Sequence, residues 1–430
     1  MKVPKTVLAF FLISLVMRIG YGVAIHRMEG TVGFVDDWDY ISYAKNILDQ
    51  GVLVPDISKL NPTADQVGPG FPLIVAMTFA LFGENYLPTV ILNALVSALI
   101  CILILYLGKE LFNEKVGIFA AGWSCIYVQY IYLIPHVLKD VWLAFLFPLV
   151  IYAFLLETKR ERISVKSLSL IFLFAFLIHM DERFFAYFPL LLVSFLPLDS
   201  MGWRNGLRKA VLFFAAVTVL MIPWLIRNYY VYGKPVVLTV RTAKFTDKIF
   251  RIPTQNLPEF VWNKALVDSI LLGREIPGLE YAGQGVTYGN LQLGVKQGRI
   301  PRKFGLLERW YVESKELWRP FRFSAGYVDG GFVFEGPWSL KHNASVGITY
   351  GLLLPFFVAG VILIIGRKNR KGIFIVSVLF LYTFIHVAVE AATSRYRVYA
   401  DAFMIIIAFY GLLELRPTVM RIIKRTATFL

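Results

Sequence analysis

The sequence is poor in charge and almost without cysteine. Charged residues make up only 17% of the 430 positions, against roughly 25% in an ordinary soluble domain. The two cysteines, Cys101 and Cys125, lie inside apolar runs without CxxC spacing, which excludes a disulfide framework and a zinc site. The sequence also shows no Walker loop and no Rossmann glycine pattern, so we expect no nucleotide-binding segment.

What the sequence has instead is apolar side chains. Hydrophobic residues make up 57% of the chain and aromatic residues 16%, and the mean hydropathy is +0.62. A single water-soluble globule of this length cannot bury that much apolar surface. The composition excludes a disordered chain, a collagen-like chain and a plain cytosolic enzyme, and it predicts an all-α polytopic membrane protein.

The apolar runs predict about ten transmembrane helices, because a span needs roughly 20 apolar residues and shorter runs are tolerated inside a bundle. They cover residues 6–25, 87–107, 116–134, 138–157, 167–180, 184–198, 210–227, 344–366, 373–391 and 396–415. Residues 6–25 are too long for a signal peptide and are interpreted as a retained first span. The run 71–82 is too short to cross, so we expect a re-entrant or interfacial helix there.

The excess of basic residues fixes the expected orientation. The chain has 44 Lys and Arg against 29 Asp and Glu, a net charge of +15. The basic residues gather in alternate connections and at the two ends: Lys2, Lys5, Lys109, Lys115, Lys159, Arg160, Arg162, Lys166, Arg204, Arg208, Lys209, Arg367, Lys368, Arg370, Lys371, Arg416, Arg421, Lys424 and Arg425. The positive-inside rule places them in the cytoplasm, which explains the charge without a nucleic-acid partner.

This orientation predicts one polytopic domain over 1–430 in the plasma (inner) membrane. Residues 26–86 and 241–343 then face outward, and 416–430 form a basic cytoplasmic tail. Within the second outer segment, 306–318 (LLERWYVESKELW) has the amphipathic spacing of a helix lying on the membrane surface.

Three carboxylates follow the first span directly. Asp36, Asp37 and Asp39 lie at the start of a predicted amphipathic helix that continues through Tyr40 and beyond. Carboxylates beside anionic headgroups are costly to hold without a task. The alternative is that Asp36 or Asp37 is simply the helix N-cap.

Three further motifs occur later in the chain. Residues 67–73 (VGPGFPL) predict a tight entry into the interfacial helix, which by itself is only a turn signal. Residues 223–229 (PWLIRNY) lie at the outer end of the seventh span, where an aromatic belt with a snorkelling Arg227 is the alternative interpretation. Residues 395–397 (RYR) start the last span on the same outer side.

The order of these four motifs along the chain, and their position on the outer side of the membrane, resemble those in the GT-C glycosyltransferases. The resemblance is to the bacterial and archaeal relatives of protein O-mannosyltransferases and of the lipid A aminoarabinose transferase. It implies a GT-C-like bundle with interfacial helices in the first outer loop and a long outer loop before the last three spans. It also implies an inverting enzyme that moves a sugar from a polyprenyl-phosphate carrier to an acceptor hydroxyl or amine on the outer face, without a cofactor.

The resemblance assigns roles to individual residues. The family's catalytic carboxylate maps onto Asp36, which would be the base. Asp37 stands where many relatives have Glu and is expected to assist or orient in the same catalytic site. Outer connections should be poor in Lys and Arg, so the cations found there are the expected donor-phosphate ligands: Lys139, Arg183, Arg227, Arg395 and Arg397. Tyr40 and Asp140 are expected to line the site. Arg227 and Arg395 are the preferred pair. Each cation has the alternative of snorkelling or of pairing with a nearby carboxylate such as Asp140, Glu182 or Glu390.

Three carboxylates, Asp36, Asp37 and Asp140, have the chemistry to chelate a divalent cation. The closer GT-C relatives generally use none, so we expect no metal. The expected partners are the donor lipid, the bilayer, and an acceptor glycan, lipid or protein.

Two other functions stay open at this level: a lipid or sugar transporter or flippase, and a polysaccharide polymerase or ligase. A transporter usually has internal repeats and ionisable residues near mid-membrane, whereas the polar residues here gather on one face. The glycosyltransferase hypothesis requires that Asp36 and the outer cations converge on one pocket at the outer leaflet.

Overall fold

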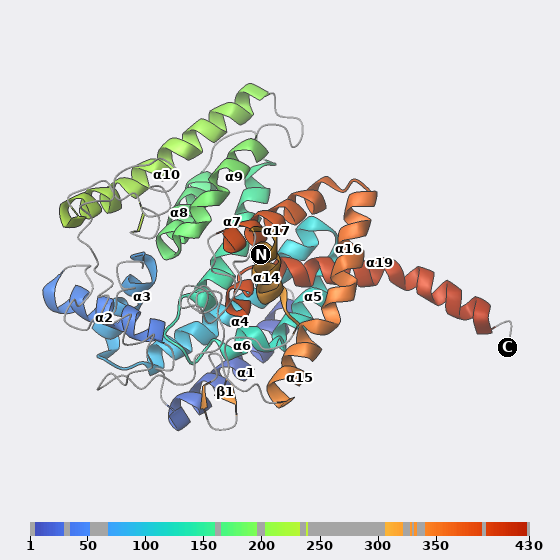
Figure 1. The fold of residues 1–430 in the computed structure, drawn as a ribbon, viewed down its shortest axis with the longest axis horizontal. Helices are drawn as coiled ribbons and strands as arrows, with labels where there is room; N and C mark the ends of the chain where they lie inside the picture. The colour runs from blue at the N-terminus through green and yellow to red at the C-terminus, as the bar shows by residue number, and fades with distance from the viewer. Residues whose placement is uncertain are drawn as a thin grey trace.

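A computed structural model describes residues 5–29, 35–51, 68–159, 165–195, 203–232, 238–239, 306–320, 327–328, 331–332, 340–388 and 393–427. Helices make up nearly all of this part of the chain (Figure 1). The strands within it are an antiparallel pair of two residues each, β1 (Tyr327–Val328) and β2 (Gly331–Phe332). The predicted all-α membrane architecture is confirmed.

The described helices fall into three groups along the chain. The first group is α1 (Lys5–Glu29), α2 (Val35–Gln50), α3 (Gly70–Phe82), α4 (Leu87–Leu111), α5 (Glu114–Cys125) and α6 (Val128–Tyr132). The second is α7 (Asp140–Glu157), α8 (Val165–Met180), the 3₁₀ helix η3 (Glu182–Tyr187), α9 (Phe188–Ser194) and α10 (Trp203–Tyr232). The third is α14 (Leu306–Trp318), α15 (Leu340–Thr349), the 3₁₀ helix η4 (Gly351–Leu353), α16 (Leu354–Gly366), α17 (Arg370–Ala388), α18 (Ser394–Arg397) and α19 (Asp401–Ala427).

Six segments of the described chain are helical, long and apolar enough to cross a membrane: Lys5–Arg27, Leu87–Leu111, Asp140–Glu157, Arg204–Tyr229, Asn343–Gly366 and Arg370–Ala388. Each of them coincides with a predicted span. The run 71–82 is the apolar helix α3, which has 13 residues. The total of about ten crossings stays a prediction.

The predicted span 116–134 is not one helix. It is divided into α5, which ends at Cys125, and the short α6, which starts at Val128. Arg18 of α1 lies at this break, fully buried, and donates to the main-chain carbonyls of Ser124 and Cys125, each at 2.9 Å, and to Ser97 Oγ at 2.8 Å. A cation at a helix C-terminus stabilises the carbonyls that have no partner within the helix.

These contacts explain an intramembrane charge that is expensive to bury alone. From the sequence alone, Glu390 is a candidate partner for Arg18, because a charge inside a span usually faces the bundle. Glu390 lies outside the described residues, and the contacts just listed are with main-chain carbonyls and a hydroxyl instead.

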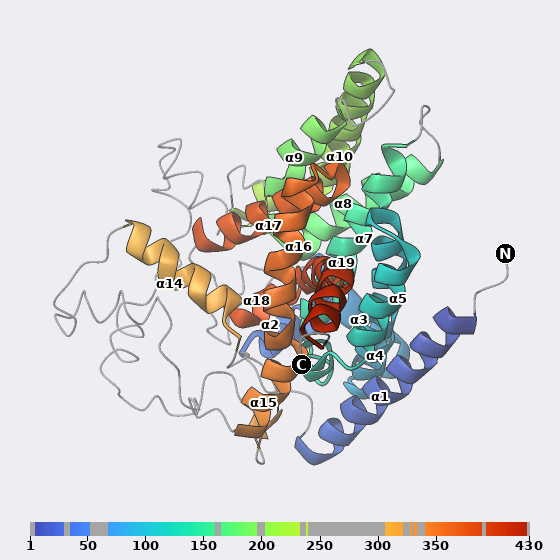
Figure 2. The same ribbon diagram turned by 90° about the vertical axis from the view of Figure 1, so that its right-hand side faces the viewer.

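Close helix contacts hold the bundle together. The α4 helix packs along both α1 and α5, and α16 packs along α19 (Figure 2). Glycines allow these approaches: a Cβ on Gly108 of α4 would lie 2.8 Å from the Cα atom of Gly117 in α5. A Cβ on Gly360 would lie 2.3 Å from the carbonyl oxygen of Ile407. Small residues at such contacts are typical of membrane helix pairs.

The basic connections meet at one end of the bundle. Glu110, at the end of α4, pairs with Lys159 after α7 at 2.6 Å and with Lys371 in α17 at 2.8 Å. At the end of α7, Glu157 lies 3.3 Å from Lys209 of α10. Connections that are far apart in sequence therefore share one side, as the alternation of basic loops predicted.

The structure tests two predictions for the last third of the chain, the helix over 306–318 and the end of the last span at 415. The predicted helix 306–318 is α14, and its apolar face packs against α17 and α18 (Figure 2). Trp310 packs edge-on against Phe384 at 5.7 Å between ring centroids, and Trp318 donates to Thr383 Oγ1 at 3.0 Å. All of 241–305 and parts of 319–343 lie outside the described residues. The last helix, α19, runs past the predicted end at 415 to Ala427 and projects beyond the bundle (Figure 1).

Candidate functional site

The first turn of α2 carries the acidic motif. The Asp37 side chain is fully buried, and its Oδ2 lies 3.6 Å from His136 Nδ1, also fully buried. The His136 carbonyl oxygen accepts from Asn93 Nδ2 at 2.8 Å, and Asn93 Oδ1 accepts from the Trp142 indole at 3.0 Å. Asp37 is thus anchored on the connection between α6 and α7. The side chain of Asp36, one residue earlier in α2, lies outside the described residues.

The glycine–proline motif before α3 is more than a turn. A Cβ on Gly68 would lie 2.2 Å from the His179 carbonyl oxygen, and one on Gly70 would lie 2.8 Å from Met180 Sδ. Only glycine permits this approach of the chain to the end of α8. The next residue, Phe71, packs edge-to-face with Tyr40 of α2, with ring centroids 4.9 Å apart. This joins α2 and α3 to the end of α8.

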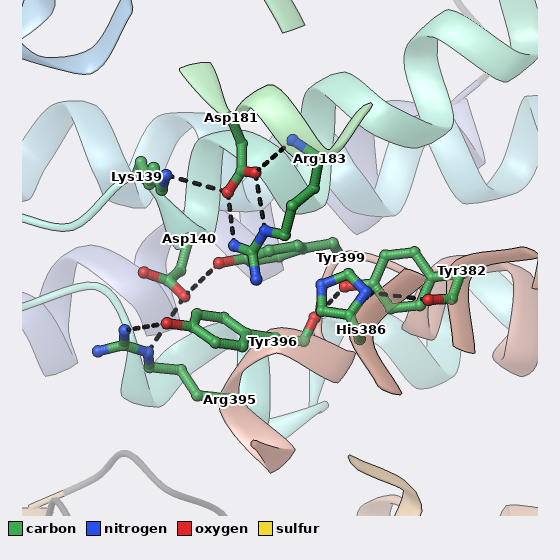
Figure 3. A network of polar contacts seen from close by, with 9 residues as sticks. All are labelled: Lys139, Asp140, Asp181, Arg183, Tyr382, His386, Arg395, Tyr396 and Tyr399. Carbon is green, nitrogen blue, oxygen red and sulfur yellow. Dashed lines mark hydrogen bonds and ion pairs between the residues drawn. The ribbon is translucent and has the colours of Figure 1, made fainter. Parts of the chain in front are cut away.

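The connections before α7 and after α8 bring two cations to one carboxylate (Figure 3). Asp181 Oδ2 lies 3.0 Å from Lys139 Nζ, and both Asp181 oxygens bond the Arg183 guanidinium, at 2.8 and 2.5 Å. Asp181 also starts η3, because its side chain accepts from the Arg183 main-chain N–H at 3.1 Å. The arrangement is a bidentate ion pair with a second cation beside it.

The charges of this group are mutually dependent. Burial by itself raises the pKa of Asp181, but the adjacent Arg183 and Lys139 outweigh burial and hold that pKa well below its ordinary value. Burial likewise opposes the charge on Arg183, and the Asp181 carboxylate raises the Arg183 pKa well above its ordinary value. Asp181 is therefore an anion and Arg183 a cation throughout the physiological range.

The start of α18 adds a third cation from a distant part of the chain. Arg395 Nε lies 3.5 Å from Asp140 Oδ1, and the same oxygen accepts from the Tyr399 hydroxyl at 2.7 Å. The Tyr396 ring contacts two guanidinium groups, with its centroid 4.3 Å from Arg183 Cζ and 5.1 Å from Arg395 Cζ. Arginine over an aromatic face is a favourable cation–π geometry.

We call this group the polar cluster. It consists of Lys139, Asp140, Asp181, Arg183, Arg395, Tyr396 and Tyr399, drawn together in Figure 3. Three cations face two carboxylates, which leaves one positive charge in excess at a largely buried position. Such a cluster is electrostatically suited to an anionic ligand.

The cluster includes four of the residues singled out from the sequence: Lys139, Asp140, Arg183 and Arg395. Tyr40 is buried on α2 against Phe71. Two predicted cations lie elsewhere. Arg227 is on α10, bonded to Asn228 and stacked on Trp224 at 4.8 Å. Arg397 is fully buried, with its Nε 3.1 Å from Asp401 Oδ1 and its guanidinium 3.5 Å from the Tyr350 ring centroid.

Sequence reasoning left out Asp181, His136, Tyr396 and Tyr399 as site residues. Asp181 carried a usable signal, because it stands with Arg183 in a polar stretch between two apolar runs. The other three had only their positions beside predicted residues. Within the described residues no group of three or more His, Cys, Asp or Glu side chains is arranged to hold a metal ion.

Comparisons with known proteins agree with this architecture. Residues 66–226 match the family model described as dolichyl-phosphate-mannose-protein mannosyltransferase. Among solved structures, the apo oligosaccharyltransferase of Archaeoglobus fulgidus matches with a TM-score of 0.58 and 15% identity, covering 98% of this chain and 52% of that one. The same organism's AglB, in complex with an inhibitory peptide and a dolichol-phosphate, matches with a TM-score of 0.57 and 14% identity over 98% and 51% of the two chains.

A weaker similarity, with a TM-score of 0.40 and 14% identity, relates 94% of this chain to 76% of ArnT from Cupriavidus metallidurans. A comparison with curated protein sequences gives no significant match. The chain spans about half the length of the oligosaccharyltransferases that it matches. Residues 66–226 are therefore similar in sequence to that mannosyltransferase family, and the chain is similar in fold to the oligosaccharyltransferases.

Proposed function

We propose that the protein is an inverting membrane glycosyltransferase that moves a sugar from a polyprenyl-phosphate carrier to an acceptor hydroxyl or amine. The observation that carries this proposal is the polar cluster, which has excess positive charge and is built from α7, η3 and α18. The dolichol-phosphate in the AglB structure, a protein of the same fold, supports a lipid phosphate as the ligand.

The cluster would act on the leaving group. As the bond from the sugar to phosphate breaks, negative charge develops on the phosphate, and Lys139, Arg183 and Arg395 supply fixed cations for it. Asp181 and Asp140 orient these cations before the ligand arrives, so little reorganisation is needed during the reaction. Arg397 has a buried structural partner in Asp401, so we assign it to the support of α18 and α19.

The carboxylates of α2 would act on the acceptor. The acceptor oxygen or nitrogen attacks the anomeric carbon from the face opposite the phosphate, the bond to phosphate breaks with its electron pair, and Asp36 takes the acceptor proton. Asp37 is enclosed completely and lies beside His136. We assign it the role of fixing the first turn of α2, and with it the position of Asp36.

The same proposal gives the orientation. The basic connections lie at the cytoplasmic end, which puts the polar cluster at the outer face of the plasma membrane. Residues 26–86 and 241–343 are then the outer loops, with acceptor choice in 241–343, and 416–430 are the cytoplasmic tail of a single domain.

The test is transfer from a radiolabelled polyprenyl-phosphate sugar by membranes containing the protein. We expect Asp36→Asn to lower the transfer rate by about 100-fold or more, because a general base contributes roughly 10²–10⁴-fold. Asp49→Asn, in the exposed last turn of the same helix, is the matched control and should transfer normally. Full activity of Asp36→Asn would refute the assignment. Consumption of the monosaccharide carrier also separates a transferase from a transporter and from a polymerase or ligase.

A further inference from the structure

His386, in the last turn of α17, has a hydrogen bond on one ring nitrogen. Its Nδ1 lies 2.9 Å from the carbonyl oxygen of Tyr382, one helical turn earlier. A carbonyl oxygen only accepts, so Nδ1 carries the proton, and Nε2 of the neutral ring is a hydrogen-bond acceptor. The tautomer is therefore fixed by the helix itself.

The second ring nitrogen is buried. His386 is 2% exposed, and its Nε2 has no hydrogen-bond partner among the residues that the structure describes. Burying a hydrogen-bond acceptor without replacing its bonds to water is unfavourable. Native proteins contain few buried polar atoms without a hydrogen-bond partner, and a bound ligand is one explanation for such an atom.

The position of His386 associates it with the polar cluster. Figure 3 shows its ring between Tyr382 on one side and Arg183 with Tyr396 on the other. The ring centroids are 4.2 Å from Tyr382 and 6.0 Å from Tyr396, and Tyr396 is the ring that contacts Arg183 and Arg395. Tyr382 fixes this region further, because its hydroxyl donates to the Tyr396 carbonyl at 2.5 Å.

We propose that His386 Nε2 accepts a hydrogen bond from a hydroxyl of the donor sugar and is a specificity-determining residue. This inference rests on the proposed function. A sugar linked to polyprenyl phosphate forms a phosphodiester, whose oxygens have no proton to donate, so the phosphate cannot satisfy Nε2. A sugar hydroxyl can, while the cations of the cluster hold the phosphate beside it.

Two substitutions separate this role from a structural one. His386→Asn places an amide near the position of Nδ1, so it keeps a donor for the Tyr382 carbonyl and removes the acceptor at Nε2. His386→Gln places an amide oxygen near the position of Nε2. If His386 only stabilised α17, Asn would be the better replacement, whereas recognition of a hydroxyl favours Gln.

The experiment measures binding of two lipids to the full-length protein in nanodiscs: polyprenyl phosphate, and polyprenyl-phosphate mannose as the sugar-bearing probe. We expect His386→Asn to reduce the preference for the sugar-bearing lipid by about tenfold, the worth of one buried hydrogen bond of about 1.4 kcal/mol. Affinity for the bare lipid should stay unchanged, and His386→Gln should retain most of the preference. The control is His179→Asn, since His179 also bonds a carbonyl one turn earlier, that of Ala175 at 2.7 Å.

The results separate a failure of the role of His386 from a failure of the proposed function. An unchanged preference in His386→Asn, with both lipids bound, would overturn the role of His386 and leave the proposed function standing. Failure of the wild-type protein to bind either lipid would overturn the proposed function and this inference with it.

Discussion

At each of two opposite ends of the bundle, one carboxylate contacts two cations. Removing the carboxylate should cost more stability at the buried end than at the exposed end. At the polar cluster, Asp181 contacts Lys139 and Arg183, whose side chains are only 12% and 7% exposed. Asp181→Asn would leave these cations buried without their anionic partner. Removing one partner of a buried ion pair costs about 3–5 kcal/mol, so we expect a loss of that size in the free energy of unfolding.

The matched control is Glu110→Gln at the other end. Glu110 contacts Lys159 and Lys371, whose side chains are 51% and 47% exposed. Water solvates these lysines after the substitution. Exposed pairs contribute about 0.2–1 kcal/mol each, so this variant should lose roughly 1 kcal/mol or less.

The chain provides its own reporter for this comparison. Cys101 and Cys125 are the two cysteines, and both are buried, so a thiol-reactive fluorophore labels the protein only as it unfolds. Unfolding in an SDS titration, followed by this dye, gives the two free-energy losses. Equal losses in the two variants, or a loss below about 1 kcal/mol in Asp181→Asn, would refute the argument from burial.

Two further predictions use the same assay. The pKa of Asp181 is depressed in the folded protein, so the Asp181 carboxylate stabilises the fold fully above the unfolded-state pKa of about 4 and loses this effect as the pH falls through the lower folded pKa. The stability of the wild-type protein should therefore fall in acid by this contribution, and that of Asp181→Asn should not. Identical acid profiles of the two proteins would contradict the prediction. Gly68→Ala places a Cβ 2.2 Å from the His179 carbonyl oxygen and should lower the free energy of unfolding by about 1–3 kcal/mol. The control Gly20→Ala, where nothing lies within 4 Å of the new Cβ, should not destabilise the protein. Equal stability of the two variants would argue against the close contact at Gly68.

The sequence was sufficient wherever a single segment determines its own structure. The apolar length of 87–107 predicts α4, and the amphipathic spacing of 306–318 predicts α14 with the observed bounds. Lys139, Arg183 and Arg395 stood out because outer connections are usually poor in basic residues. A charge that breaks this rule is visible without a structure, and these three cations meet in one cluster.

The sequence was insufficient where partners come from distant segments. Hydropathy predicts one span over 116–134, but it cannot show that Arg18 of α1 binds the carbonyls that end α5. Arg395 and Arg397 look equivalent in the RYR motif. Helical geometry separates them, since Arg395 faces Asp140 while Arg397 faces Asp401, one turn later. Such choices depend on packing between elements, which local patterns do not contain.

The central claim is that the polar cluster binds the phosphate of a lipid carrier. A cryo-electron microscopy structure of the protein with bound polyprenyl phosphate tests it most directly. We predict phosphate density within hydrogen-bonding distance of at least two of Lys139, Arg183 and Arg395, with the first turn of α2 beside the head group. Phosphate density next to Arg227 on α10, or at any position away from these three cations, would contradict it.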